Sequence, residues 1–145
     1  MTNLRLVNGL ESKISFPLVH EASLHAGMRN TFVESHKAIQ DEHGRPIAVV
    51  GSGYTLVQNN DVYPQIEDAI YASAINTRGM TRDIKSSHGG ARTIVTYSFP
   101  AHKVDINDKG DNVMLTIKVL NSYDGSWRFM TLVGAVRQIC SNGMV

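Results

Sequence analysis

Histidines and a single cysteine are the side chains of this sequence best suited to metal binding or nucleophilic catalysis. The closest of the six histidines are His20 with His25 and His36 with His43, five and seven residues apart. A zinc-binding helix needs two histidines four residues apart, and no such pair occurs. Cys140 is the only cysteine and lies near Ile139 and Met144, and a lone cysteine of this kind is typically a small buried side chain. We therefore expect no metal, no cofactor and no enzymatic activity.

Two further patterns resemble ligand-binding loops without completing them. Gly51-Ser52-Gly53 follows an apolar run but lacks the Lys-Ser/Thr pair of a P-loop and the full dinucleotide fingerprint. The polar stretch 105–111 contains three aspartates but lacks the spacing and terminal Glu of an EF-hand loop. The polar stretch therefore indicates a solvated loop.

Cationic side chains are concentrated in the middle of the chain. The whole chain balances 14 Lys and Arg against 13 Asp and Glu, whereas residues 78–103 contain five cations and one acid. These five cations are Arg78, Arg82, Lys85, Arg92 and Lys103. They flank Gly89-Gly90, whose backbone N–H groups could approach a phosphate. The alternative is that they are the solvated charges that exposed hairpins carry.

The hydrophobic pattern divides the chain into strands around one helix. Strands are predicted over residues 31–40, 45–50, 80–87, 91–99, 112–121 and 126–133, and the helix over 61–76 with Gly79 as its terminator. Gly51 and Gly53 predict a bulge in a strand that resumes at Tyr54. Residues 1–30 form an arm or irregular segment, and 135–140 begins a helix or extends the last strand. The fold class is α+β, a mostly antiparallel sheet of hairpins packed on one main helix.

Two turns fix the predicted strand registers. A hairpin at Gly89-Gly90 pairs Arg82 with Tyr97 and Lys85 with Ile94.

Asp124-Gly125, the strongest hairpin signal, pairs Val119 with Met130 on an apolar face that should rest on the helix. The other face carries two aromatic residues, Trp127 and Phe129, together with Lys118. Aromatic residues beside a cation can stack bases and hold phosphates. A covering subunit or C-terminal segment is the alternative explanation of that face.

Length and composition predict a single domain over residues 1–145, with an α+β core over 31–145. A lone cysteine excludes a disulfide framework. Neither a secretory signal nor a membrane-spanning run is present in the sequence, so we expect a cytoplasmic protein. The chain ends on Met144-Val145 without a polar tail. That ending suggests truncation at the C-terminus.

Four segments occur in an order that resembles a known family: residues 50–59, 90–92, 120–126 and 136–142. Their succession resembles the phage/plasmid-like family of uncharacterised proteins, a domain-of-unknown-function group, over about residues 45–145. That family commonly carries His where this chain has Tyr123, which argues against an essential imidazole there. It also continues beyond the last segment. The resemblance implies a phage or mobile-element origin, the cytoplasm of a bacterial host, and a context of DNA metabolism.

The predicted order of elements is also similar in shape to Rad-type single-strand annealing proteins, which form rings and hold single-stranded DNA in a basic groove. This likeness implies groove cations at Arg82, Lys85, Arg92 and Lys103, secondary contacts at Lys118, Arg128 and Arg137, and stacking platforms at Tyr123 and Trp127. Arg78, from the same cationic stretch, is a further candidate for DNA binding. The leading hypothesis is an oligomeric, non-enzymatic phage protein that binds or anneals single-stranded DNA in recombination or replication. The alternative is a phage module that engages or inhibits a host protein.

Overall fold

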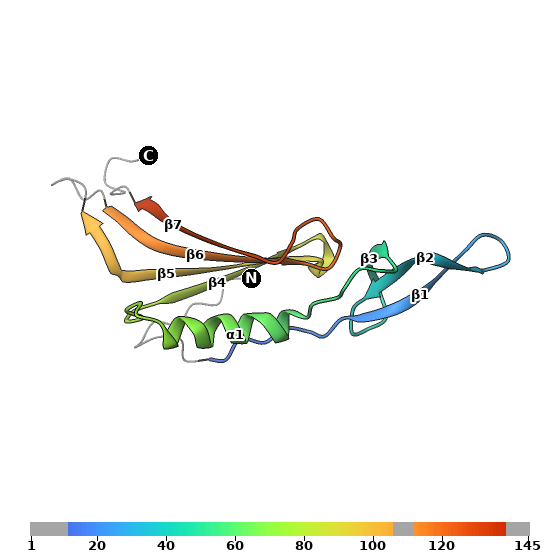
Figure 1. Ribbon diagram of the computed structural model, residues 1–145, viewed down its shortest axis with the longest axis horizontal. Coiled ribbons are helices and arrows are strands. Elements are labelled where there is room, and N and C mark those ends of the chain that lie inside the picture. Colours follow the sequence, from blue (N-terminus) through green and yellow to red (C-terminus); the bar gives the residue numbers. More distant parts are fainter. Residues whose placement is uncertain (1–11, 106–111, 139–145) are drawn as a thin grey trace.

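A computed structural model describes residues 12–105 and 112–138, and these form two antiparallel sheets and one α-helix. The three-stranded sheet has the order β1 (His20–Ala26), β2 (Thr31–Gln40), β3 (Pro46–Gly51). The four-stranded sheet has the order β4 (Thr81–Ser87), β5 (Arg92–Asp105), β6 (Asn112–Ser122), β7 (Met130–Gln138). The helix α1 (Asn59–Ala72) joins the two sheets, and a short turn η1 (His88–Gly90) joins β4 to β5. Figure 1 shows an elongated molecule with the smaller sheet at one end and α1 along the larger one.

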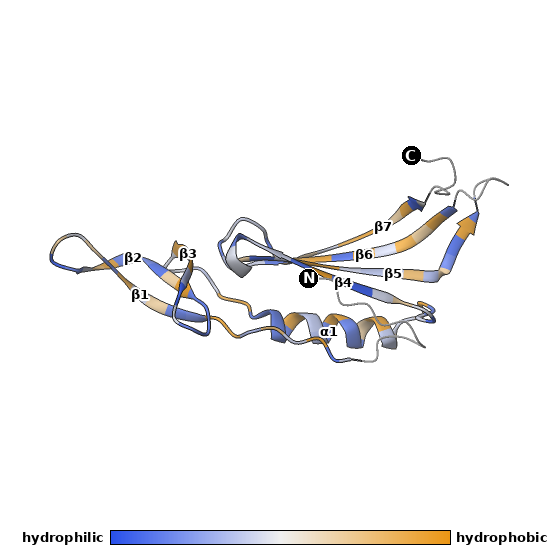
Figure 2. Ribbon diagram, turned by 180° about the vertical axis from the view of Figure 1, so that it is seen from behind, coloured by the Kyte–Doolittle hydropathy of each residue, from blue (hydrophilic) through white to orange (hydrophobic). Residues whose placement is uncertain are grey.

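The main core lies between α1 and one face of the four-stranded sheet. Tyr63 and Ile70 of α1 pack with alternate residues of the sheet, among them Val95 and Ile117. The Tyr63 hydroxyl lies 3.1 Å from the Thr93 carbonyl oxygen and 3.0 Å from that of Val119, so it bridges β5 and β6. Figure 2 shows apolar residues recurring along these strands. The period of two in the strands and of 3.6 in the helix produces this packing.

The helix begins two residues earlier and ends four residues sooner than the sequence predicts. Gln58 precedes its first turn without a side-chain cap. At the other end the Ser73 hydroxyl and backbone N–H both donate to the Ile70 carbonyl, which terminates the helix there. Gly79 has a positive φ of 73° but lies in the turn before β4, so its prediction as helix terminator is wrong.

The expected single set of hairpins is in fact two sheets. Gly51 ends β3, and a turn closed by the Tyr54 N–H on the Gly51 carbonyl leads the chain into α1. The predicted bulge and resumed strand are therefore wrong, because the Tyr54 hydroxyl instead reaches the Ser122 carbonyl at 2.7 Å. The strand β1 was not foreseen, since most of its residues are exposed and only its pairing with β2 defines it. The first eleven residues of the predicted arm, and residues 106–111 of the polar loop, lie outside the described ranges.

One predicted register is confirmed and the other is wrong by one residue. Arg82 pairs with Tyr97 as expected. In the second hairpin Leu120, not Val119, lies opposite Met130. The reason is a long connection instead of a two-residue turn, in which the Ser122 hydroxyl donates to the Trp127 carbonyl and accepts from its N–H.

A one-residue shift turns the side chains of β7 to the opposite face. The strand also continues to Gln138, which confirms the extended alternative for the start of 135–140. The coarse fold class is thus confirmed as α+β and mostly antiparallel. In the described ranges, no helix is long and apolar enough to cross a membrane.

Candidate nucleic-acid interface

The four-stranded sheet turns one face to α1 and the other face away from it. Val95 and Ile117 belong to the core under α1, so the residues that alternate with them point to the opposite face, here called the outer face. Four predicted cations lie on the outer face: Lys85 of β4, Arg92 and Lys103 of β5, and Lys118 of β6. Sequence position scattered these cations over 34 residues, and strand pairing brings them together on three neighbouring strands.

Apolar side chains share the outer face with these cations. In the row of Lys85, the paired residues are Ile94, Leu120 and Met130. In the next row Lys118 has Leu132 beside it. Lys103 pairs with Met114, which is four residues from Lys118 along β6, or about 13 Å at the usual strand rise. The face therefore offers positive charges separated by apolar contact surface.

Arg92 contacts both Asp124 and the ring of Trp127 at one end of the outer face. The Arg92 Nε donates to Asp124 Oδ2 at 2.9 Å, and its guanidinium carbon lies 5.7 Å from the centre of the Trp127 ring. Burial acts to raise the pKa of Asp124, but hydrogen bonds from Ser126 and Arg92 outweigh it and hold that pKa below its usual value. The carboxylate thus stays ionised and keeps the guanidinium oriented.

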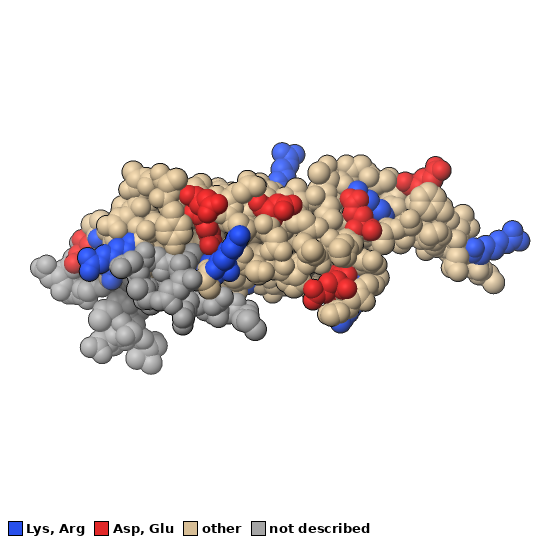
Figure 3. All heavy atoms as spheres, turned by 90° about the horizontal axis from the view of Figure 1, so that it is seen from below, with Lys and Arg blue, Asp and Glu red and all other residues tan. Residues whose placement is uncertain are grey.

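Charge on the outer face is partly balanced. Lys85 is highly exposed and lies 3.9 Å from Asp83 Oδ2. Lys118 is exposed and makes no ion pair with any described carboxylate. On the side of α1, Figure 3 shows acidic and basic side chains interspersed. Asp105 lies on the outer face two residues from Lys103, so the net attraction of this face for an anion rests most on Lys118.

Arg82 does not belong to this surface, and its predicted role as a groove cation is wrong. Its side chain is 2% exposed, and Nη1 lies 2.9 and 3.0 Å from the two carboxylate oxygens of Glu67. The Tyr97 hydroxyl donates to Glu67 Oε2 at 2.6 Å. Burial raises the pKa of Glu67, while the hydrogen bond from Tyr97 and the charge of Arg82 oppose the rise. Arg82 holds α1 to β4 and is not accessible to a phosphate.

The prediction that Tyr123 is a stacking platform is also wrong. Tyr123 is 2% exposed, and its hydroxyl accepts the Asn59 backbone N–H at 2.9 Å. Burial raises the pKa of this hydroxyl.

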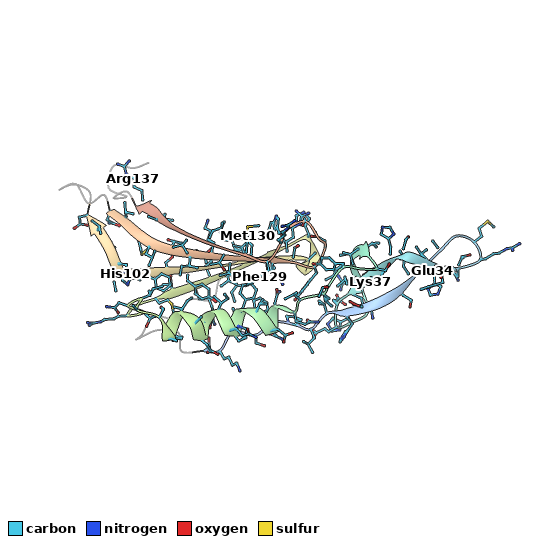
Figure 4. The ribbon with its side chains drawn as sticks, viewed as in Figure 1. Glu34, Lys37, His102, Phe129, Met130 and Arg137 are labelled. Atoms are coloured by element: carbon cyan, nitrogen blue, oxygen red, sulfur yellow. The ribbon has the colours of Figure 1, made fainter. Side chains whose placement is uncertain are left out.

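The other predicted residues lie apart from the four cations. Arg78 is in the exposed turn before β4, and Arg128 is in the exposed loop before β7. Arg137 alternates to the helix-side face of β7, at the end of the strand remote from Phe129 and Met130 (Figure 4). These three cations are not part of the outer face.

Sequence reasoning missed three consecutive amides, Gln58, Asn59 and Asn60. The Gln58 side chain donates to the Val19 carbonyl at 2.7 Å and accepts its N–H at 3.2 Å. Asn60 makes the same double contact with Phe16, at 2.7 Å in both directions. Asn59 turns inward and is bonded to Asn121 at 2.8 Å. The only sequence signal was the unusual run of amides itself.

Metal-binding side chains do not gather in the described ranges, where no group of three or more His, Cys, Asp or Glu could hold an ion. Cys140 lies outside these ranges.

Comparison with known proteins gives a family and no characterised relative. No curated protein matches the chain, and no solved structure matches it. The family described as "Domain of unknown function (DUF932)" matches residues 46–145, which include α1 and the whole four-stranded sheet as far as it is described. The resemblance to a domain-of-unknown-function family is thereby confirmed, and the chain belongs to the DUF932 family.

Proposed function

We propose that this protein binds single-stranded DNA on the outer face of its four-stranded sheet and acts as an annealing protein of a phage or mobile element, without enzymatic activity. The observation that supports this most is the gathering of Lys85, Arg92, Lys103 and Lys118 on one face from three strands. Lysine and arginine attract phosphates, and each neutralised phosphate releases a counterion.

A single strand suits the outer face better than a duplex does. The rows of Ile94, Leu120 and Leu132 provide apolar contact between the cations, and Trp127 provides an aromatic ring beside Arg92. Unstacked bases can use such surfaces, whereas the bases of a duplex are stacked on one another. We therefore expect preference for single strands with little sequence specificity.

Assembly with further copies would use β7, which has a partner strand on one side only among the described residues. Leu132, Val133 and Val136 on β7 are 51%, 68% and 44% exposed. An apolar edge strand of this kind favours pairing with another strand. A second copy added there would extend the outer face and lengthen the track for the strand.

The test is a pair of charge-reversal variants with the same net charge. In Lys85→Glu/Lys118→Glu both changes lie on the outer face, whereas in the control Lys13→Glu/Arg29→Glu both changes are exposed and lie elsewhere. Fluorescence anisotropy with a labelled single-stranded oligonucleotide should show affinity reduced at least about tenfold in the first variant and little changed in the control. Absence of binding by the natural protein at low salt, or equal losses in both variants, would refute the proposal.

A second candidate function is docking to a host protein, favoured by the apolar exposure of β7 and by the acids that pair with Lys85 and Arg92. This second function predicts that the protein is a monomer and does not bind oligonucleotides. A photo-reactive residue at Val133 would then cross-link to one host protein at a defined ratio, and a link between two copies of this chain would speak against it.

A further inference from the structure

A cavity of about 350 Å³ lies where the two sheets approach each other. Its walls come from the extended segment before β1, the β2–β3 turn, β3, the start of α1, the end of β4, η1, the start of β5 and the residue after β6. In Figure 1 the η1 end of the four-stranded sheet lies toward β3. This volume is at the lower end of the range for small-molecule sites.

Neutral, deeply buried polar groups form part of the lining. Asn59, Thr93 and Tyr123 are 4%, 1% and 2% exposed. Asn59 Nδ2 donates to the Thr93 hydroxyl at 3.2 Å, and its backbone N–H donates to the Tyr123 hydroxyl at 2.9 Å. The Tyr123 hydroxyl thus acts as an acceptor toward Asn59, and its own proton has no acceptor among the described residues. A ligand could receive that hydrogen bond.

Two carboxylates line the cavity from the β2–β3 turn. Asp41 Oδ1 accepts the backbone N–H groups of His43 and Arg45, each at 2.9 Å. These contacts, that of Arg45 first, hold the pKa of Asp41 below its usual value. Glu42 is exposed beside it. Each carboxylate also has a basic neighbour, with Arg45 Nε 3.8 Å from Asp41 Oδ2 and His43 Nε2 3.5 Å from Glu42 Oε1. Ionised carboxylates only accept hydrogen bonds, so this side of the cavity favours N–H donors.

Apolar side chains that are held in place form another part of the walls. Phe16 is fixed by the double hydrogen bond with Asn60 and lies with its ring centre 5.2 Å from that of Tyr63. Val19 and Ile47 pack into the smaller core with Tyr123. A flat, uncharged ligand with N–H donors on one edge and an acceptor on another edge matches these walls.

We propose that this cavity binds a single nucleobase that carries an exocyclic amino group, with the amino edge toward Asp41 and Glu42. The base could come from a free nucleoside or from an unstacked position in a strand that continues from the outer face round the η1 end to the helix-side face, which carries Ser86 and Thr93. The second source rests on the proposed function, and the first does not.

Ligand-observed NMR with deoxyadenosine, deoxycytidine and thymidine tests the proposal directly. Deoxyadenosine and deoxycytidine, which carry the amino group, should show saturable binding. Thymidine should bind with an affinity about tenfold lower, because its carbonyl would face the carboxylates. Ser86→Phe places a ring at the cavity from an exposed position and should abolish binding, whereas Ser23→Phe on β1 should not. Lack of saturation by any nucleoside, or unchanged binding by Ser86→Phe, would overturn the proposal.

Glu42→Gln separates recognition from simple structural support. The amide of glutamine offers a hydrogen-bond donor as well as an acceptor. The ratio of the affinity for deoxyadenosine or deoxycytidine to that for thymidine should therefore fall, and the affinity for thymidine itself should not decrease. An unchanged preference would contradict the assignment of the amino edge to this side of the cavity.

Competition distinguishes the two sources of the base and the two proposals. If a base of the bound strand enters the cavity, an oligonucleotide of cytidines will displace deoxycytidine from the natural protein but not from Lys85→Glu/Lys118→Glu. If only free nucleosides enter, no oligonucleotide will displace them. If the protein binds oligonucleotides but no nucleoside, the cavity site is refuted and the proposal for the outer face is kept. If it binds nucleosides but no oligonucleotide, the proposal for the outer face is refuted and the cavity site is kept.

Discussion

Arg82 is a cation in the core, where the carboxylate of Glu67 balances its charge and the Tyr97 hydroxyl donates to that carboxylate. Its Nη1 contacts Glu67 and the Ser12 carbonyl, and Tyr97 completes the cluster through the same carboxylate. A buried ion pair offsets a large desolvation penalty, so removal of one partner leaves the other charge stranded.

We therefore expect Arg82→Ala to lower the free energy of unfolding by about 3–5 kcal/mol, measured by urea denaturation with circular dichroism. The double replacement Glu67→Leu/Arg82→Met should cost less than the single Arg82 change, because no unpaired charge remains. A loss below about 1 kcal/mol for Arg82→Ala, of the size of an exposed ion pair, would contradict the buried cluster.

Buried tyrosines set the behaviour of the fold at high pH. Burial raises the pKa of Tyr63 and of Tyr97 well above the ordinary value of 10.0, and the nearby Glu67 adds to the rise at Tyr97. A raised pKa in the folded state means that the unfolded state loses its protons first. The contribution of these raised pKa values to the free energy of unfolding is therefore fully present below pH 10. It is lost as the pH rises above that value.

An alkaline titration should show tyrosinate absorbance appearing together with the loss of circular dichroism for these tyrosines. Tyr97→Phe should make the decline of stability with pH less steep. Ionisation of every tyrosine in a protein that keeps its native spectrum would contradict their burial.

The sequence allowed part of this chemistry to be predicted. The register that pairs Arg82 with Tyr97 was correct, and it placed Arg82 on the face of Ile84 and Val95. Counting the cations of residues 78–103 does not distinguish that buried face from the exposed one. The partner of Arg82, Glu67, lies 15 residues away on α1, and no local pattern indicates such a contact.

The segment before β1 is an element without secondary structure of its own, and the amides Gln58 and Asn60 hold it. Each side chain exchanges two hydrogen bonds with the backbone of that segment. This arrangement replaces the missing strand pairing for Phe16 and Val19.

Asn60→Ala should lower the free energy of unfolding by about 1–3 kcal/mol and speed tryptic cleavage at Lys13, because two backbone groups of Phe16 lose their partner. Gln65→Ala, an exposed change on the same helix, is the control. Equal cleavage rates in the two variants would show that Asn60 does not hold the segment.

The hairpin of β6 and β7 determines which side chains each face presents. Ser122 and Trp127 close a wider loop than Asp124-Gly125 alone suggested, and the shift places Leu132 on the outer face and Val133 on the other. Loop width depends on these side-chain contacts, so turn propensity could not supply it. The β2–β3 and β4–β5 hairpins and the helix followed from periodicity, whereas β1 and the helix ends did not.

Val133→Lys should reduce the molar mass measured by light scattering, since a charge on an apolar edge strand opposes pairing with a second copy. Thr55→Lys, an exposed change outside the strands, should not alter the mass. A natural protein that is monomeric at all concentrations would argue against assembly through β7.

The molecule as a whole is nearly neutral, with a net charge of +1, yet its charges are sorted in space. Arg82 is neutralised inside, whereas Lys85, Lys103 and Lys118 remain on the outer face. Net charge alone could not separate these groups, and the sequence count treated them alike. Strand pairing supplied the distinction.

The dependence of affinity on salt tests the outer face most directly. The logarithm of the binding constant for single-stranded DNA should fall linearly with the logarithm of salt concentration, with a slope near −0.7 for each phosphate neutralised. Lys85→Gln and Lys118→Gln should each make the slope less negative by about 0.7, and Arg82→Met should leave the slope of the folded protein unchanged. A slope near zero, or one that does not respond to the two lysine changes, would contradict binding of a strand on this face.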